Sequence, residues 1–312
     1  MTSGNPLALI LLFAIPLFIG NVFQEIYTVF DTAIVGYVLG DSAIAAIGST
    51  GSVYSLILDI AWGLNGGYMI IVARLFGANE KEKLKVSIAT VIILNAIVTI
   101  ALTIIALTCL KPFMRLIQVP ESIFEQAHAY IFVILAGMVS SMCYNMCAGI
   151  MRALGNSLTP LYFLIFSSVV NLSCDCLFVI VFRWGVQGAA IATVVAQTFS
   201  AILAVIYLLK KYKDYLPEKR HFRQSKEVFE EMTASGLSMA AMYCDLGSIV
   251  YSRAVNGLGE LYITAQTSSR KLIEMCMMPF ESLSSANSTF VSQNYGAKKF
   301  DRIRKCIKSV SV

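Results

Sequence analysis

Apolar residues in this chain come in eight long blocks separated by short polar or charged stretches. The blocks lie at about residues 7–38, 42–73, 86–110, 122–150, 160–182, 186–210, 235–257 and 261–294, and a ninth begins near Ile303. Each of the eight is long enough to cross a bilayer as a helix, which takes about 20 residues. Helices are the expected form, because an open strand edge cannot satisfy its hydrogen bonds inside lipid. The pattern predicts an all-α, polytopic membrane protein.

The composition agrees with lipid as the solvent of this chain. It contains 57% hydrophobic and 14% charged residues, and its mean hydropathy is +0.71. The net charge of +5 does not suggest nucleic acid, because the basic residues lie in short loops between apolar blocks. The chain has no Walker-type phosphate loop, no His-Glu-x-x-His motif and no metal-ligand spacing of cysteines. We therefore expect neither an enzyme nor a structural metal or cofactor.

Lysine and arginine predict the orientation of the chain in the membrane. If the N-terminus is cytoplasmic, 18 of the 24 basic residues fall in inside loops, within 74–85, at Arg152, and within 210–226 and 298–308. Cytoplasmic loops carry an excess of Lys and Arg. We expect a multi-pass protein of the inner (plasma) membrane with its N-terminus in the cytoplasm.

An internal repeat with an offset of 219 residues predicts two halves. Leu39-Gly40-Asp41 recurs as Leu258-Gly259-Glu260, and Phe76-Gly77-Ala78 recurs as Tyr295-Gly296-Ala297. The repeat begins after six helices, so the second copy enters the membrane in the same direction as the first. We expect a six-helix lobe at 1–210, a cytoplasmic loop at 211–232 and a partial second lobe at 233–312. The sequence stops within its ninth helix, so we expect a truncated second lobe with about eight helices and part of a ninth in all.

Acidic residues within the apolar blocks are the first candidates for function, because Asp at a helix centre costs ~2.5–3.5 kcal/mol to insert. Asp31, Asp175 and Thr193 each lie about seven residues from the outer end of their helices, or ~10 Å deep at 1.5 Å per residue. Asn171 precedes Asp175 by one helical turn, on the same face. These oxygens at one depth suit a proton or Na⁺. The plainer alternative is that the groups hydrogen-bond one helix to another.

Three further acids are weaker candidates for a second-lobe or substrate site. Asp245 lies near the middle of the seventh block. Glu25 is about 120° around the helix from Asp31. Glu274 follows Arg270 by four residues, where it could neutralise the guanidinium. Both histidines, His128 and His221, fall at an outer edge and in a loop, where we expect them to be solvated.

Several motifs resemble the multidrug and toxic compound extrusion (MATE) transporters, nearest the bacterial branch with the DNA-damage-inducible F-type proteins. They are QEIYTVFDTAIVG at 24–36, RALGNSLTP at 152–160, GVQGAAIAT at 185–193 and FVSQNYGA at 290–297. The resemblance follows the whole chain in order. Two positions depart from the family pattern: Glu25 stands where Gln is common, and Ser238 stands where Pro is expected.

The resemblance implies twelve helices in two lobes and export of hydrophobic or cationic compounds in exchange for H⁺ or Na⁺. By motif match, Asp31, Asn171, Asp175 and Thr193 correspond to the family's first-lobe cation site, with Na⁺ possible at the two aspartates. Asp245 is similar in place to a second-lobe acid of another branch. We expect a monomer in contact with membrane lipid. The first alternative is a lipid-linked oligosaccharide flippase of a related superfamily. A cavity rich in Lys and Arg, facing a pyrophosphate, would favour that function. The second is a membrane sensor or enzyme without transport.

Overall fold

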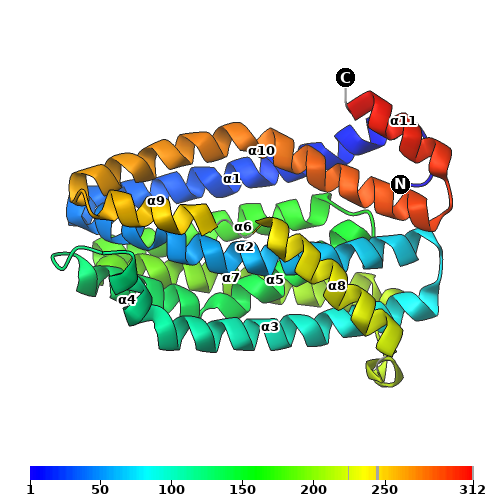
Figure 1. Cartoon of the computed structure of the whole chain (residues 1–312), viewed down its shortest axis with the longest axis horizontal. Coiled ribbons are helices and arrows are strands. Elements are labelled where there is room, and N and C mark those ends of the chain that lie inside the picture. The colour runs from blue at the N-terminus through cyan, green and yellow to red at the C-terminus, as the bar shows by residue number, and fades with distance from the viewer. Residues whose placement is uncertain (224, 244–245, 311–312) are drawn as a thin grey trace.

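The computed structural model describes residues 1–223, 225–243 and 246–310, and every regular element in these ranges is a helix. The long helices run side by side along the long axis of the molecule (Figure 1). The first half of the chain forms α1 (Pro6–Leu39), α2 (Asp41–Gly77), α3 (Lys81–Leu116), α4 (Phe124–Ala136), α5 (Met138–Ala153), α6 (Leu158–Asp175), the π-helix η1 (Cys176–Val181) and α7 (Gly185–Lys211). The rest forms the short η2 (Lys213–Tyr215) and η3 (Lys219–Phe222), then α8 (Lys226–Tyr243), α9 (Leu246–Asn256), α10 (Glu260–Gly296) and α11 (Phe300–Val310).

The first half carries the membrane spans that the apolar blocks predict. Among the described residues, five helices are long and apolar enough to cross a membrane, and α4 with α5 forms a sixth if that bent pair is one span. The all-α, multi-pass membrane fold is therefore confirmed. The block at 122–150 is not one straight helix, because α4 and α5 meet at 45°. Gly137 lies at this bend, and a side chain there would overlap Val194 of α7.

The repeat in the sequence is also a repeat in structure. Helices α2 and α10 both have 37 residues, and the next helices begin at Lys81 and Phe300, again 219 residues apart. Each long helix follows a glycine of the same unusual conformation, with φ 86° and ψ 179° at Gly40 and φ 101° and ψ 177° at Gly259. Residues other than glycine rarely adopt a positive φ, which explains the glycine at both positions.

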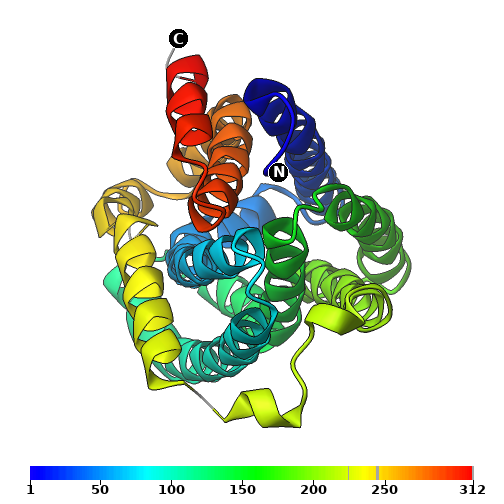
Figure 2. The ribbon, with the colours of Figure 1, turned by 90° about the vertical axis from the view of Figure 1, so that its right-hand side faces the viewer.

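The start of the second half packs directly onto the first. Met232 and Ala240 of α8 belong to the same apolar core as residues of α2, α3, α5 and α7. Figure 2 shows α8, in yellow, running beside the cyan helices. Helix α8 begins at Lys226, inside the range that we expected for the loop. The i,i+4 ion pair of Lys226 with Glu230, at 3.7 Å, supports the first turn of this helix.

The N-terminus, the α2–α3 turn and the α10–α11 turn lie together at one end of the bundle (Figure 1). We call this end, which carries most of the basic residues, the basic end. The loop between the halves docks here through His221, which we expected to be solvated but which is 4% exposed. Its Nε2 lies 3.2 Å from Glu82 Oε2, and its Nδ1 accepts the Glu218 backbone N–H at 3.0 Å. These two partners on either side of the ring explain why the prediction was wrong.

Candidate cation site in the first lobe

Asp175 is the last residue of α6 and is fully buried. The helix continues as the π-helix η1, whose wider turns recur at functional sites in other proteins. Asp31, in α1, is 8% exposed and lies close enough to Asp175 for the two carboxylates to repel each other. The fold thus brings together two acids that lie far apart in the sequence.

Asn171 links Asp175 to α7. With its amide nitrogen facing the carboxylate, Asn171 donates to Asp175 Oδ2 at 3.1 Å and accepts from the Thr193 backbone N–H at 3.3 Å. The Thr193 hydroxyl donates to Ala189 O at 3.2 Å, one turn earlier in α7. All four residues predicted for the cation site therefore come from three neighbouring helices and form one cluster.

Two tyrosines lie near the acid pair, and neither was predicted as part of the site. Tyr130 of α4 lies in the field of both Asp31 and Asp175. Tyr27 of α1 lies in the field of Asp31. The sequence held one signal for Tyr27, which precedes Asp31 by one helical turn. It held none for Tyr130, whose helix comes close only in the folded bundle.

The electrostatics of the cluster favour a bound positive charge. Like charges repel strongly where water is excluded, and a buried carboxylate pair is stabilised by a proton or a cation. Asp175 Oδ1 is buried and has no hydrogen-bond partner within the part of the chain that the structure describes. Oxygen ligands of this kind suit a hard cation such as Na⁺ as well as a proton. The arrangement can therefore hold one or the other.

The remaining candidates stay predictions. Glu25 is partly buried in α1, and Asp245 lies outside the described residues. Glu274 belongs to α10, but its side chain is also outside what the structure describes, so its proposed pairing with Arg270 stays a prediction. Arg270 itself reaches across to the first half, where its Nη2 donates to Ser55 Oγ of α2 at 2.8 Å.

A helical bundle that crosses the membrane repeatedly and buries an acidic, oxygen-rich cluster is typical of multi-pass membrane transporters. The MatE family model matches residues 16–177 and 236–310, so the chain belongs to the MatE family.

Curated relatives of the chain are named as transport and resistance proteins. It is 26% identical to the probable multidrug resistance protein YpnP of Bacillus subtilis, over 97% of this chain and 68% of that protein. It is 22% identical to the multidrug export protein MepA of Staphylococcus saprophyticus, over 96% and 66%. It is also 22% identical to an FAD transporter of Shewanella oneidensis, over 86% and 61%. The chain thus spans about two-thirds of the length of such relatives.

Solved structures share the fold. A crystal structure of MATE in the bent conformation is 26% identical with a TM-score of 0.84, covering 97% of this chain and 68% of that one. A transporter of the MOP superfamily from Pyrococcus furiosus is 25% identical with a TM-score of 0.86, covering 97% and 68%.

Proposed function

We propose that this chain belongs to a secondary transporter that exports hydrophobic or cationic drugs or toxic compounds in exchange for H⁺ or Na⁺. The buried pair of Asp31 and Asp175 carries the proposal, because two carboxylates in an apolar bundle need a positive charge beside them. The names of the multidrug resistance and export proteins among its relatives support the same function. The acidic site also favours this function over the oligosaccharide flippase, which would need basic groups for a pyrophosphate.

Each residue of the cluster has a distinct task in the proposed exchange. Asp31 and Asp175 hold the proton or Na⁺. Asn171 fixes the orientation of the Asp175 carboxylate through its hydrogen bond to Oδ2, and it ties that carboxylate to α7 at Thr193. Binding of the ion then changes how tightly the protein holds its substrate. Without such differential affinity, no ligand shifts the balance between two conformations.

The setting of the protein follows from the same reasoning. The lobes rock so that the substrate cavity opens to each side of the inner membrane in turn, and the basic end faces the cytoplasm. The first lobe is 1–210, and the second lobe begins with α8, within the range that we expected for the loop. The protein works as a monomer surrounded by lipid and needs no cofactor besides its coupling ion.

The proposal is tested by transport in vesicles under an imposed Na⁺ or pH gradient. The substrate panel pairs a flat cationic dye with FAD, because one relative is named as an FAD transporter. We expect dye movement to follow one of the two gradients and to be lost in Asp31→Asn. Ser173→Ala is the matched control, since Ser173 is exposed on α6 and donates to Val169 of its own helix. Gradient-driven dye transport that persists in Asp31→Asn would overturn the proposed mechanism.

A further inference from the structure

Helices α2 and α10 cross at the basic end with their backbones in direct contact. A side chain on Gly77 of α2 would overlap the carbonyl oxygen of Gln293 in α10. A side chain on Gly296 of α10 would overlap the carbonyl oxygen of Arg74 in α2. Backbone atoms cannot turn aside as the end of a flexible side chain can. The two helices can therefore pack this closely only while both positions are glycine.

The contact is reciprocal under the repeat. At the offset of 219 residues, Arg74 corresponds to Gln293 and Gly77 corresponds to Gly296. Gly77 therefore contacts Gln293, the counterpart of Arg74. In the same way, Gly296 contacts Arg74, the counterpart of Gln293. Such a self-complementary contact marks a two-fold axis. The crossing of α2 and α10 lies on the pseudo-two-fold axis that relates the two halves.

Glycines extend the same close packing from α10 to α8. A side chain on Gly67 of α2 would overlap Ser235 O, and it would lie 2.6 Å from Gly236 Cα. On Gly63, one turn earlier, it would lie 2.6 Å from Ala240 Cα. The Ser235 hydroxyl also donates to Gly67 O at 2.9 Å. We call this contact of α2 with α8 and α10 the glycine seam.

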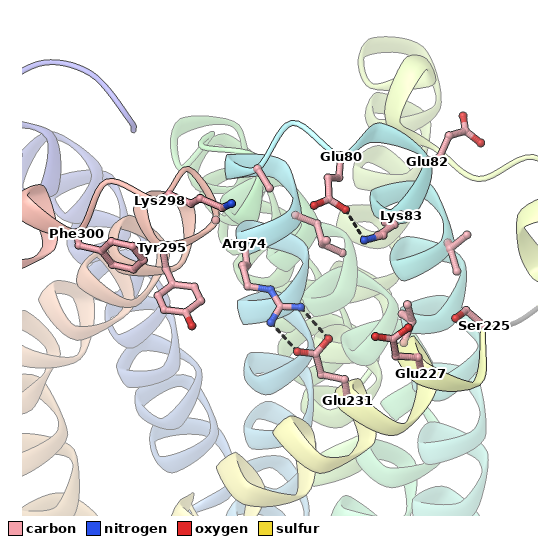
Figure 3. Close-up of a pocket in the computed structure, with 15 residues that line it drawn as sticks. Arg74, Glu80, Glu82, Lys83, Ser225, Glu227, Glu231, Tyr295, Lys298 and Phe300 are labelled. Atoms are coloured by element: carbon pink, nitrogen blue, oxygen red, sulfur yellow. Dashed lines mark hydrogen bonds and ion pairs between the residues drawn. The ribbon is translucent and has the colours of Figure 1, made fainter.

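An ion pair between α2 and α8 lies at the solvent-exposed edge of the glycine seam. Arg74 donates to both carboxylate oxygens of Glu231 in α8, at 2.6 and 2.7 Å. Figure 3 shows the pair at the wall of a cavity of about 620 Å³ at the basic end, lined from both halves. The two side chains are 30% and 41% exposed. A bidentate pair fixes geometry, but a pair this exposed adds little stability and separates readily.

We propose that the glycine seam and the Arg74–Glu231 pair form the gate that seals the basic end between the two halves. The proposal rests on the proposed transport function, because the halves of an alternating-access transporter must part at each side in turn. The glycines bring the backbones into contact when the gate is closed. The ion pair stabilises the closed form and breaks when the halves separate.

Chemical labelling of a cysteine placed behind the seam tests the gate. Met232 of α8 is fully buried in the core of the first half, so we would introduce Met232→Cys. Its reaction with a membrane-impermeant maleimide, less the background of the native cysteines in the parent, reports opening of the seam. This readout needs neither substrate nor an ion gradient, so it succeeds or fails independently of the proposed function.

We expect Gly67→Ala and Gly77→Ala each to raise the labelling rate about tenfold, as overpacking against backbone forces the helices apart. Gly66→Ala is the matched control, because the nearest atom to a side chain there is a flexible Met239 methyl at 3.9 Å. Glu231→Gln, which adds no bulk, should also raise the rate. The charge exchange of Arg74→Glu with Glu231→Arg should restore it. Equal labelling in Gly66→Ala, Gly67→Ala and Glu231→Gln would overturn the gate.

Discussion

Asn171 lies one helical turn before Asp175 and donates a hydrogen bond to its Oδ2 at 3.1 Å. Because the same amide accepts the Thr193 backbone N–H at 3.3 Å, it fixes the carboxylate relative to a second helix. One oxygen of Asp175 is thus engaged, while Oδ1 is buried without a hydrogen-bond partner among the described residues. This division suits a carboxylate that is held in place by one oxygen and takes a cation or proton with the other.

Replacing Asn171 by Leu should change the affinity for the coupling ion without removing either acid. The change removes a donor that stabilises the charged carboxylate, which is typically worth about 1–3 kcal/mol, or roughly 5- to 150-fold in affinity. If the coupling ion is a proton, Asp175 should bind it more tightly, and half-maximal transport should need a lower proton concentration. Ser173→Ala, on the exposed side of the same helix, should leave it unchanged. An unaltered ion dependence in Asn171→Leu would show that the amide does not position the carboxylate.

Gln293 should matter for stability as well as for packing. Its Nε2 donates to Ala153 O at 2.8 Å, and the side chain is fully buried, so it ties α10 to the C-terminal end of α5. Gln293→Leu leaves that carbonyl unsatisfied and should lower the free energy of unfolding by about 1–3 kcal/mol. Thermal denaturation in detergent measures the loss. Thr289→Val, one turn earlier, removes a hydroxyl that bonds Ser285 of its own helix. If both variants melt together, the tie from Gln293 contributes nothing.

The loop between the halves should undock in acid. The charge of Arg220 and a hydrogen bond from Lys85 lower the pKa of the exposed Glu218 carboxyl below 4.5, its ordinary value. Its contribution to docking is therefore present above that value and is lost as the pH falls through the lowered pKa. Hydrogen exchange of the loop amides, compared at each pH between the parent and Glu218→Gln, isolates this group. We expect faster exchange in the variant at neutral pH and no difference in acid. A difference that is independent of pH would contradict the assignment.

The sequence predicted the spans of the first lobe because apolar length alone decides them. It did not predict the bend between α4 and α5, since that bend depends on Gly137 meeting Val194 of a distant helix. Depth along each helix put Asp31 and Asp175 at one level, because each lies about seven residues from the outer end of its helix. It could not place Tyr130, which reaches the acids through the packing of α4.

The repeat was legible because glycines mark it at fixed positions. Gly77 and Gly296 were visible as part of a recurring motif, but their contact with the opposite backbone was not. That contact depends on how α2 and α10 cross, and side-chain spacing along one helix carries no information about a crossing. His221 is a second residue whose contacts could not be predicted from the sequence. A loop histidine was expected in water, and Glu82 of α3 keeps it buried.

The proposed mechanism has the Asp31–Asp175 pair exchange a cation for the transported compound. Its most direct test is the release of H⁺ or Na⁺ from the purified protein in detergent, followed as a cationic dye is added without any membrane gradient. We expect the parent to release the ion as dye binds, and Asp175→Asn to bind dye with no release. Equal release from the parent and from Asp175→Asn would contradict the account.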